Sequence, residues 1–411
     1  MSKVIVKQRS VVGLLFVGAM STHVYAAESG IKPVAKKDVV ESGLNWSANV
    51  GLGFDSNIYR APSESYVDFA PTVPVAVTPD EQSGFYVPLG LKGVYRNLLN
   101  DSNSLVSSYR FSGDIYVDSD FSNANNFSHK LRLGDEYTIK KSKTGSDTVY
   151  VGLLVSSVRD QYVDRDTGMD QTSSAGTVDV SDRYSYNATG VEAAYNSNTG
   201  KTKYSVKFKL INRDYDDPVV ISQYDNTYMS LGGDIQFRLS KPSKLKLGVR
   251  HFTYDYDERP SRNAQGRLFA SNPTRKYTYD QLSIAYAYRI NKKWRSYAEY
   301  VIKQRSDDSV GYHDYDANKI RLRIKYRHNK KLQMKLALTS WQRDYPNAFA
   351  FDRQAQGALD YDGVIVAFDS EYHMDKHKSL VAELNWRDDN STDLRYDYQR
   401  SKVLVGMKWK Y

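Results

Sequence analysis

Apolar and polar residues alternate along most of the chain. In residues 45–54 the apolar side chains are those of Trp46, Ala48, Val50, Leu52 and Phe54, and an Asn, Ser or Gly separates each from the next. Successive side chains of a strand point to opposite faces, so this pattern predicts a strand with one apolar face and one small, polar face. The pattern recurs in residues 105–117, 204–210, 229–239, 282–290, 320–326, 364–372 and 380–386.

Sixteen runs of this kind cover the chain, and each is about ten residues long, which is what a tilted strand needs to cross a bilayer. They lie near residues 45–55, 85–96, 104–117, 127–140, 148–158, 184–195, 202–213, 227–239, 244–256, 277–290, 294–305, 318–328, 332–343, 361–373, 379–387 and 395–411. The connections between them alternate in length. Residues 56–84 form a long connection and residues 97–103 a short one, and the alternation continues to the end of the chain.

Outer-membrane barrels combine an even number of antiparallel strands with short periplasmic turns and longer extracellular loops. We therefore predict an all-β fold for residues 44–411: a transmembrane, antiparallel, up-and-down β-barrel of about 16 strands. A soluble β-sandwich is the alternative, but it does not predict an alternation of loop length over the whole chain. The 34 tyrosines, against 14 Phe and 5 Trp, suit such a wall, and we expect them at its two water–lipid boundaries.

The first 26 residues have a different character. Lys3, Lys7 and Arg9 precede an apolar run over residues 11–20, which is shorter than the roughly 20 residues that span a bilayer. We expect residues 1–26 to be a cleaved signal peptide that directs the protein to the bacterial outer membrane, with an uncleaved anchor helix as the alternative. Removal of its three cations, with no acid in the segment, lowers the formal charge from +9 to +6. Residues 27–43 do not alternate, and they read as a short periplasmic tail.

The end of the chain carries a second assembly feature. Val403, Val405, Met407, Trp409 and Tyr411 share one face of the last predicted strand, and the final residue is aromatic. This pattern is similar to the terminal-strand signature of outer-membrane proteins, although a Phe would be more typical than Tyr411. The resemblance implies that Trp409 and Tyr411 form an assembly signal read by the barrel assembly machinery. Outer-membrane lipids and lipopolysaccharide are the expected surroundings.

If the apolar face contacts lipid, the other face lines the lumen. Lys319, Arg321, Arg323, Lys325 and Arg327 then all point inward from one strand, with no acid between them. The same rule adds further pore-lining and candidate substrate-binding cations at Arg110, Arg132, Lys207, Lys209, Arg250, Arg289, Lys303 and Arg305. It places fewer acids inside, at Asp114, Glu136, Asp234, Glu299, Asp369, Glu371 and Glu383.

This excess of inward cations predicts a lumen that concentrates anions and disfavours cations. The alternative is that these cations only form ladders of ion pairs with inward acids. For the stripe from Lys319 to Arg327, Glu299 is the one facing acid on a neighbouring strand that the sequence places beside it. We therefore expect most of the stripe to stay unneutralised.

Catalytic and cofactor motifs are scarce. The chain has no cysteine, which removes disulfides, thiolate metal sites and cysteine nucleophiles. No Gly-x-Ser-x-Gly nucleophile elbow, phosphate-binding loop or nucleic-acid module occurs. His313 with Asp314 and Asp316 is the one histidine–acid cluster that a barrel hydrolase could use, and it falls in a predicted loop. We predict that the protein is not an enzyme, needs no cofactor or metal, and does not bind nucleic acid.

Short motifs add a family resemblance. The segment Gly53-Phe54-Asp55-Ser56-Asn57-Ile58-Tyr59-Arg60-Ala61-Pro62 resembles the opening hairpin of the "β-barrel porin 2" type of outer-membrane protein. Arg213-Asp214-Tyr215-Asp216 and Tyr398-Gln399-Arg400 are similar to that group too. Because members are associated with exopolysaccharide production, the resemblance implies a role in polymer export or assembly. A cationic lumen is also similar to that of the alginate exporter, but no binding residue can be carried over from it.

Our leading hypothesis is an outer-membrane channel that passes an anionic polysaccharide or oligosaccharide, in exopolysaccharide export or assembly. One alternative is a general or oligosaccharide-uptake porin. Another is a non-conducting scaffold for assembly or adhesion, with its lumen closed by loops such as residues 56–84 and 159–183.

Overall fold

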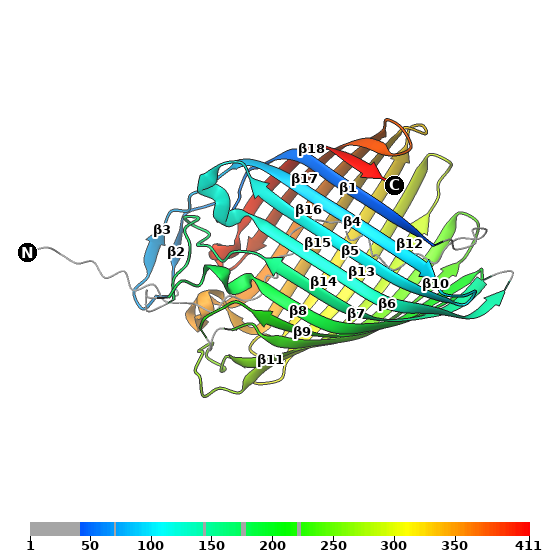
Figure 1. The fold of residues 1–411 in the computed structure, drawn as a ribbon. Coiled ribbons are helices and arrows are strands. Elements are labelled where there is room, and N and C mark those ends of the chain that lie inside the picture. Colours follow the sequence, from blue (N-terminus) through cyan, green and yellow to red (C-terminus); the bar gives the residue numbers. More distant parts are fainter. Residues whose placement is uncertain (1–41, 70, 143–144, 174–177, 220–222) are drawn as a thin grey trace, which may run out of the picture.

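The chain folds into a closed, antiparallel β-barrel of sixteen strands (Figure 1), described here from a computed structural model. The structure describes residues 42–69, 71–142, 145–173, 178–219 and 223–411. The predicted signal peptide, residues 1–26, and most of the predicted tail, residues 27–43, lie outside them. In the described ranges, no helix is long and apolar enough to cross a membrane.

Each barrel strand pairs with its neighbours in the chain, and β1 pairs with β18 to close the sheet. The strands are β1 (Gly43–Asp55), β4 (Gly84–Leu98), β5 (Asn103–Tyr116), β6 (Asn126–Ser142), β7 (Gly145–Arg159), β8 (Tyr186–Asn198), β9 (Thr202–Tyr215), β10 (Asn226–Arg238), β11 (Ser243–Pro260), β12 (Thr274–Tyr288), β13 (Trp294–Asp307), β14 (Tyr315–Arg327), β15 (Leu332–Phe349), β16 (Ala358–His373), β17 (Lys378–Ser391) and β18 (Tyr398–Lys410). The predicted fold, strand number and pairing are therefore confirmed.

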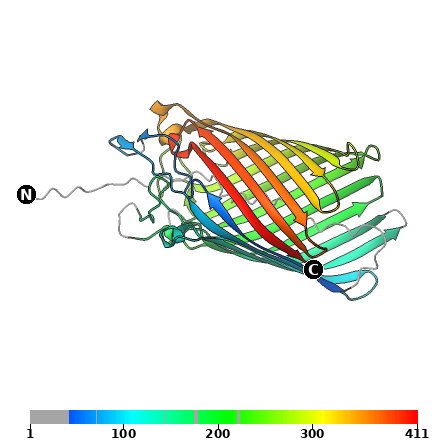
Figure 2. The same ribbon diagram turned by 90° about the horizontal axis from the view of Figure 1, so that it is seen from above.

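The long loops gather at one end of the barrel and the short turns at the other, where the C-terminus lies (Figures 1 and 2). The first long loop carries a small two-stranded sheet of β2 (Tyr66–Asp68) and β3 (Val75–Val77). Short 3-10 turns occupy other long loops, at η1 (Ser119–Ala124), η2 (Ser181–Tyr184), η4 (Ala350–Asp352), η5 (Gln354–Gln356) and η6 (Leu394–Tyr396). The predicted alternation of long and short connections is confirmed.

The two faces of the wall follow the predicted alternation. On β14, Ile320, Leu322 and Ile324 point outward and are 50%, 45% and 43% exposed, because no protein atoms cover that face. An apolar outer band on a closed antiparallel barrel is the architecture of outer-membrane proteins, since a bilayer offers backbone groups no hydrogen-bond partner.

Several strands run further toward the long loops than the apolar pattern indicates. Strand β15 extends to Phe349, where the alternation predicted an end near residue 343, and β11 extends to Pro260 rather than residue 256. In these extensions the outward positions are polar, as at Asp257 and Asp344. Polar side chains are tolerated there because the wall has risen above the hydrocarbon.

The tyrosines are distributed differently from our expectation. Near the short turns they do form an outward aromatic girdle, and its exposed members are Tyr95, Tyr137, Tyr195, Tyr204, Tyr286, Tyr288 and Tyr372. At the other end most of them point inward and are buried, as Tyr256, Tyr277, Tyr315 and Tyr345 show. The prediction of tyrosine belts at both lipid boundaries was therefore wrong at the long-loop end.

A buried ionic cluster fastens the closing seam between β1 and β18. Asp55, which is fully buried, accepts a hydrogen bond from Arg400 Nε at 2.8 Å and from the Tyr116 hydroxyl at 2.7 Å. Lys402 Nζ lies 3.5 Å from the same carboxylate and 3.1 Å from Asp114. The cluster therefore joins β1, β5 and β18 at the long-loop end.

The residues after Asp55 extend this fastening. The Asn57 side chain accepts a hydrogen bond from the Ala61 N–H at 2.8 Å and donates to the Gln399 carbonyl at 3.0 Å. Asp55-Ser56-Asn57, part of the motif that suggested a family resemblance, thus has a structural role in holding the first strand to the last.

We predict that Asp55→Asn destabilises the barrel by about 3–5 kcal/mol, because it leaves Arg400 and Lys402 buried without their carboxylate. The free energy of unfolding in urea, measured in detergent micelles, tests this. Asp280→Asn is the matched control, since Asp280 forms an exposed pair with His251 on the outer wall. Equal stability of the Asp55 variant and the native protein would contradict the assigned role of the cluster.

Candidate functional site: the inner wall and its loops

The cationic stripe on β14 lies where the sequence predicted. Lys319, Arg321, Arg323 and Lys325 occupy inward positions and are partly covered, whereas Arg327 is exposed at the short-turn end. Arg321 pairs with Glu299 on β13 at 3.0 Å, the one partner that was foreseen. Within the described part of the chain, the other four cations form no ion pair with a carboxylate.

Aromatic side chains flank this stripe on both sides. Tyr297 on β13 lies directly opposite Arg323, whose guanidinium carbon is 5.1 Å from the centre of the ring. Trp341 on β15 lies opposite Lys319 and is half-buried. The inner wall thus combines cations with apolar ring faces over three adjacent strands.

A second cationic group lies across the barrel. Glu192 on β8 is 7% exposed, and its carboxylate forms ion pairs with Arg132 Nε at 3.3 Å and Lys209 Nζ at 3.8 Å. We did not predict Glu192 as an inward residue, although alternation with its outward neighbour Val191 indicates that it points into the lumen. Arg110 and Lys207 form no ion pair within the described residues, and Arg110 lies opposite two further cations, Lys92 and Lys130.

Toward the long loops, the predicted pore cations are embedded in aromatic rings. Arg305 is 3% exposed, lies 4.4 Å from the Tyr315 ring centre and donates its Nε proton to the His313 carbonyl at 2.6 Å. Lys303 lies 5.0 Å from the same ring, and Arg250 donates to Ser230 Oγ at 3.3 Å. Ring faces stabilise such cations, because their π clouds are negative.

The remaining predicted residues lie near the two ends of the barrel wall. Arg289 follows the end of β12 and is exposed in a short turn, where its N–H donates to the Pro242 carbonyl at 2.8 Å. Trp409 points outward from β18, and the Tyr411 ring stacks on Trp46 with centroids 4.6 Å apart. His313, Asp314 and Asp316 do not form one cluster, since the two carboxylates bind the Asp307 N–H and the Gln304 amide respectively.

The inward tyrosines and arginines of β9 to β18 form a lining that we call the tyrosine–arginine ring. The tyrosine rings from Tyr228 to Tyr361 contact one another edge to face or with tilted planes. They are Tyr215, Tyr228, Tyr254, Tyr256, Tyr277, Tyr279, Tyr315, Tyr345, Tyr361 and Tyr398 with Arg213, Arg250, Arg305, Arg343 and Arg387. The ring places a wall of aromatic faces and guanidinium groups just below the long loops.

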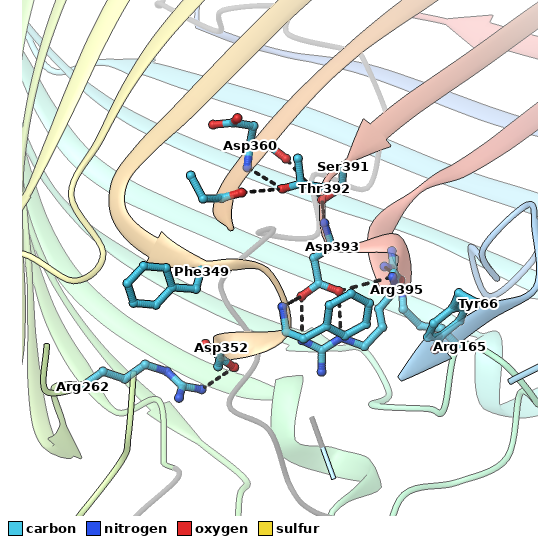
Figure 3. A network of polar contacts seen from close by, with 12 residues as sticks. Tyr66, Arg165, Arg262, Phe349, Asp352, Asp360, Ser391, Thr392, Asp393 and Arg395 are labelled. Carbon is cyan, nitrogen blue, oxygen red and sulfur yellow. Dashed lines mark hydrogen bonds and ion pairs between the residues drawn. The ribbon is translucent and has the colours of Figure 1, made fainter. Parts of the chain in front are cut away.

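Above this ring, the loops are tied to one another by polar contacts (Figure 3). Asp393 accepts two hydrogen bonds from Arg395, at 2.8 and 2.6 Å, and one from the Phe351 N–H at 2.9 Å. Asp352 pairs with Arg262 at 3.1 Å. We call these contacts the loop network, because they join the loops after β11, β15 and β17.

The loop network holds two residues in a strained backbone. Phe351 and Asp352 both have φ of 55°, a left-handed conformation that costs a non-glycine residue roughly 1–3 kcal/mol. Burial raises the pKa of the Asp352 carboxyl above its ordinary value, against the opposing effect of Arg262. The Tyr312 hydroxyl also binds Asp352, at 3.2 Å, so loop 308–314 belongs to the same network.

We predict that Asp352→Ala loosens the loops after β11 and β15, because Arg262 then loses its buried carboxylate. Trypsin cleavage after the exposed Arg267 should become about tenfold faster, since cleavage follows local opening. Asp280→Ala serves as the control. A cleavage rate unchanged by Asp352→Ala would show that the network does not restrain these loops.

No family model and no curated protein matches the sequence. Solved structures do resemble the chain. An anion-selective porin from Comamonas acidovorans shares 12% identity and a TM-score of 0.46 over 90% of this chain and 99% of its own. A bacterial polysaccharide outer membrane secretin shares 9% identity and a TM-score of 0.44 over 89% and 98%. The outer membrane channel DcaP of Acinetobacter baumannii shares 13% identity and a TM-score of 0.40 over 91% and 99%. Similarity at this level concerns the barrel alone.

Proposed function

We propose that this protein is an outer-membrane channel that passes anionic saccharides along a cationic inner wall, in exopolysaccharide export or assembly. The observation that carries the proposal is the β14 stripe. Lys319, Arg323 and Lys325 point into the barrel, and none of them pairs with a carboxylate in the described part of the chain. Their charge is therefore available to a passing anion.

The physical argument is electrostatic. A water-filled bore with low-dielectric walls focuses the field of its wall charges, so it raises the local concentration of anions. Alternate residues of one strand lie about 6.7 Å apart, so the stripe offers a row of similar, weak sites rather than one deep site. Such a row favours conduction, since an anion can enter easily and move from site to site.

The aromatic neighbours favour a saccharide over a small inorganic anion. Tyr297 and Trp341 flank the stripe, and a sugar ring presents apolar C–H faces that pack on aromatic rings. An acidic sugar could contact a ring and a cation at once. The family resemblance in the sequence also favours a saccharide, because that family is associated with exopolysaccharide production.

One observation favours a second candidate, a non-conducting scaffold. The loop network ties loops together across the long-loop end, as a permanently closed barrel would require (Figure 3). Conductance in planar lipid bilayers separates the two functions. A stable current supports the channel, and no current from correctly folded protein would support the scaffold.

We predict that replacing Lys319, Arg323 and Lys325 together by Glu inverts the ion preference of the channel, because the inner wall changes sign there. The reversal potential in a KCl gradient measures this preference. It should move from the value expected for a chloride-selective channel toward the value expected for a potassium-selective channel. The control replaces three exposed turn lysines, Lys292, Lys330 and Lys376, by Glu. Unchanged selectivity in the stripe variant would refute the proposed role of the stripe.

We also predict that Glu192→Gln strengthens anion preference. The substitution removes the carboxylate shared by Arg132 and Lys209 and leaves their two positive charges facing the lumen. The same KCl-gradient measurement should show a shift of the reversal potential further toward that of chloride. An unchanged reversal potential would mean that this group lies outside the conduction path, and a shift toward potassium would contradict the proposed effect of Glu192.

A further inference from the structure

Tyr398, at the start of β18, has a hydroxyl group that the fold leaves without a hydrogen bond. Its side chain is 1% exposed, and within the described residues the hydroxyl oxygen has no partner. A buried hydroxyl that makes no hydrogen bond is costly, and such groups are rare in folded proteins. The position therefore needs an explanation beyond packing.

Guanidinium groups lie around the Tyr398 side chain. The Arg165 carbon Cζ lies 5.2 Å from the centre of the Tyr398 ring, and that of Arg387 lies 5.5 Å from it. Arg60 and Arg400 are close enough to interact electrostatically with the same side chain. A guanidinium can only donate hydrogen bonds, so none of these groups can accept the proton of Tyr398.

Carboxylates of the protein neutralise two of these arginines. Asp389 binds Arg387 at 2.8 Å, and Asp55 binds Arg400 at 2.8 Å. Asp160 faces Arg60 without forming an ion pair, and burial raises the pKa of the Asp160 carboxyl.

Arg60 and Arg165 form no ion pair with a carboxylate of the described residues, although Asp160 acts electrostatically on Arg60 and Asp166 on Arg165. Within the described part of the chain, the Arg60 guanidinium forms no hydrogen bond or ion pair. Arg165 donates to the Arg395 carbonyl at 3.2 Å and otherwise lies over the rings of Tyr396 and Tyr398. Both residues are only partly buried.

The backbone of Arg60 adopts a conformation that is energetically unfavourable for a residue with a side chain. Arg60 has φ of 58°, a left-handed conformation that disfavours side chains with a Cβ. The turn is held by Asn57, whose side chain donates to the Ala61 carbonyl at 2.9 Å and to the Gln399 carbonyl at 3.0 Å. A strained non-glycine residue that is fixed in this way commonly belongs to a functional site.

We propose that Arg60, Arg165 and Tyr398 form a binding subsite for the carboxylate group of an acidic saccharide at the long-loop end of the barrel. The carboxylate accepts the Tyr398 proton and the guanidinium protons, and so it supplies the acceptor that the protein lacks. Carboxylate geometry matches a guanidinium fork, and hydrogen bonds between charged groups are strong. This subsite rests on the proposed passage of anionic saccharides and names the chemical group that is recognised.

Titration calorimetry with trigalacturonate, on the full chain in detergent micelles, tests the subsite. Tyr398→Phe should weaken binding about tenfold or more, because it removes one hydrogen bond to a charged acceptor. The same variant should unfold at an equal or higher urea concentration, since it also removes an unsatisfied buried hydroxyl. A purely structural role would instead lower that midpoint.

Two further variants sharpen the test. Arg60→Asn should also weaken binding at least tenfold, while Asn tolerates the left-handed backbone and keeps the turn. Tyr361→Phe is the matched control, because the Tyr361 hydroxyl is equally buried and without a hydrogen bond but lies elsewhere in the tyrosine–arginine ring. It should leave the affinity for trigalacturonate unchanged.

The outcomes separate the subsite from the proposed function. Anion preference in KCl together with trigalacturonate binding that Tyr398→Phe does not weaken would overturn the subsite alone. Binding that is sensitive to Tyr398→Phe in a barrel without anion preference would support the subsite and overturn the proposed channel. Equal binding of the neutral maltotriose, or no binding of trigalacturonate, would overturn the subsite as well.

Discussion

Closure of the sheet is the constraint on which the rest of this structure depends. Inside a bilayer no water is available to satisfy backbone N–H and C=O groups, so a spanning sheet can have no free edge. Strand β1 meets β18 over nine residue pairs, from Ser47 opposite Lys410 to Asp55 opposite Lys402. The alternation of side chains then divides the wall into a lipid side and a lumen side, and every charged residue of the strands inherits its environment from that division.

The sequence was sufficient to predict the barrel wall, because the alternation of apolar and polar residues and the alternation of loop length can both be read from short stretches of the chain. Alternation is a property of neighbouring residues, so the strands could be located before any contact was known. The same rule placed the stripe from Lys319 to Arg327 and found its partner Glu299. The same rule assigns Glu192, Arg400 and Lys402 to the inner wall, although these three were not among the residues that we predicted there.

The long-loop end could not be predicted in the same way. Beyond residue 256, in Asp257-Glu258-Arg259-Pro260, strand β11 continues, but its polarity resembles a loop because the outer position no longer needs to be apolar. Alternation in such a segment does not indicate which residue faces inward, since polar side chains are tolerated on both faces at the water boundary. The contacts of Arg60, Arg262 and Asp352 depend on loops that are distant in sequence, and no local pattern encodes them.

The seam cluster also constrains the order of assembly. Asp55 and Arg400 are 345 residues apart, so the carboxylate near the start of the barrel gains its guanidinium only when the last strand arrives. Until then the two outermost strands present open edges, and Asp55 stays hydrated instead of buried. Neutralisation of this carboxylate thus coincides with completion of the cylinder, and a chain that pairs its final strand out of register would leave an uncompensated charge at the junction.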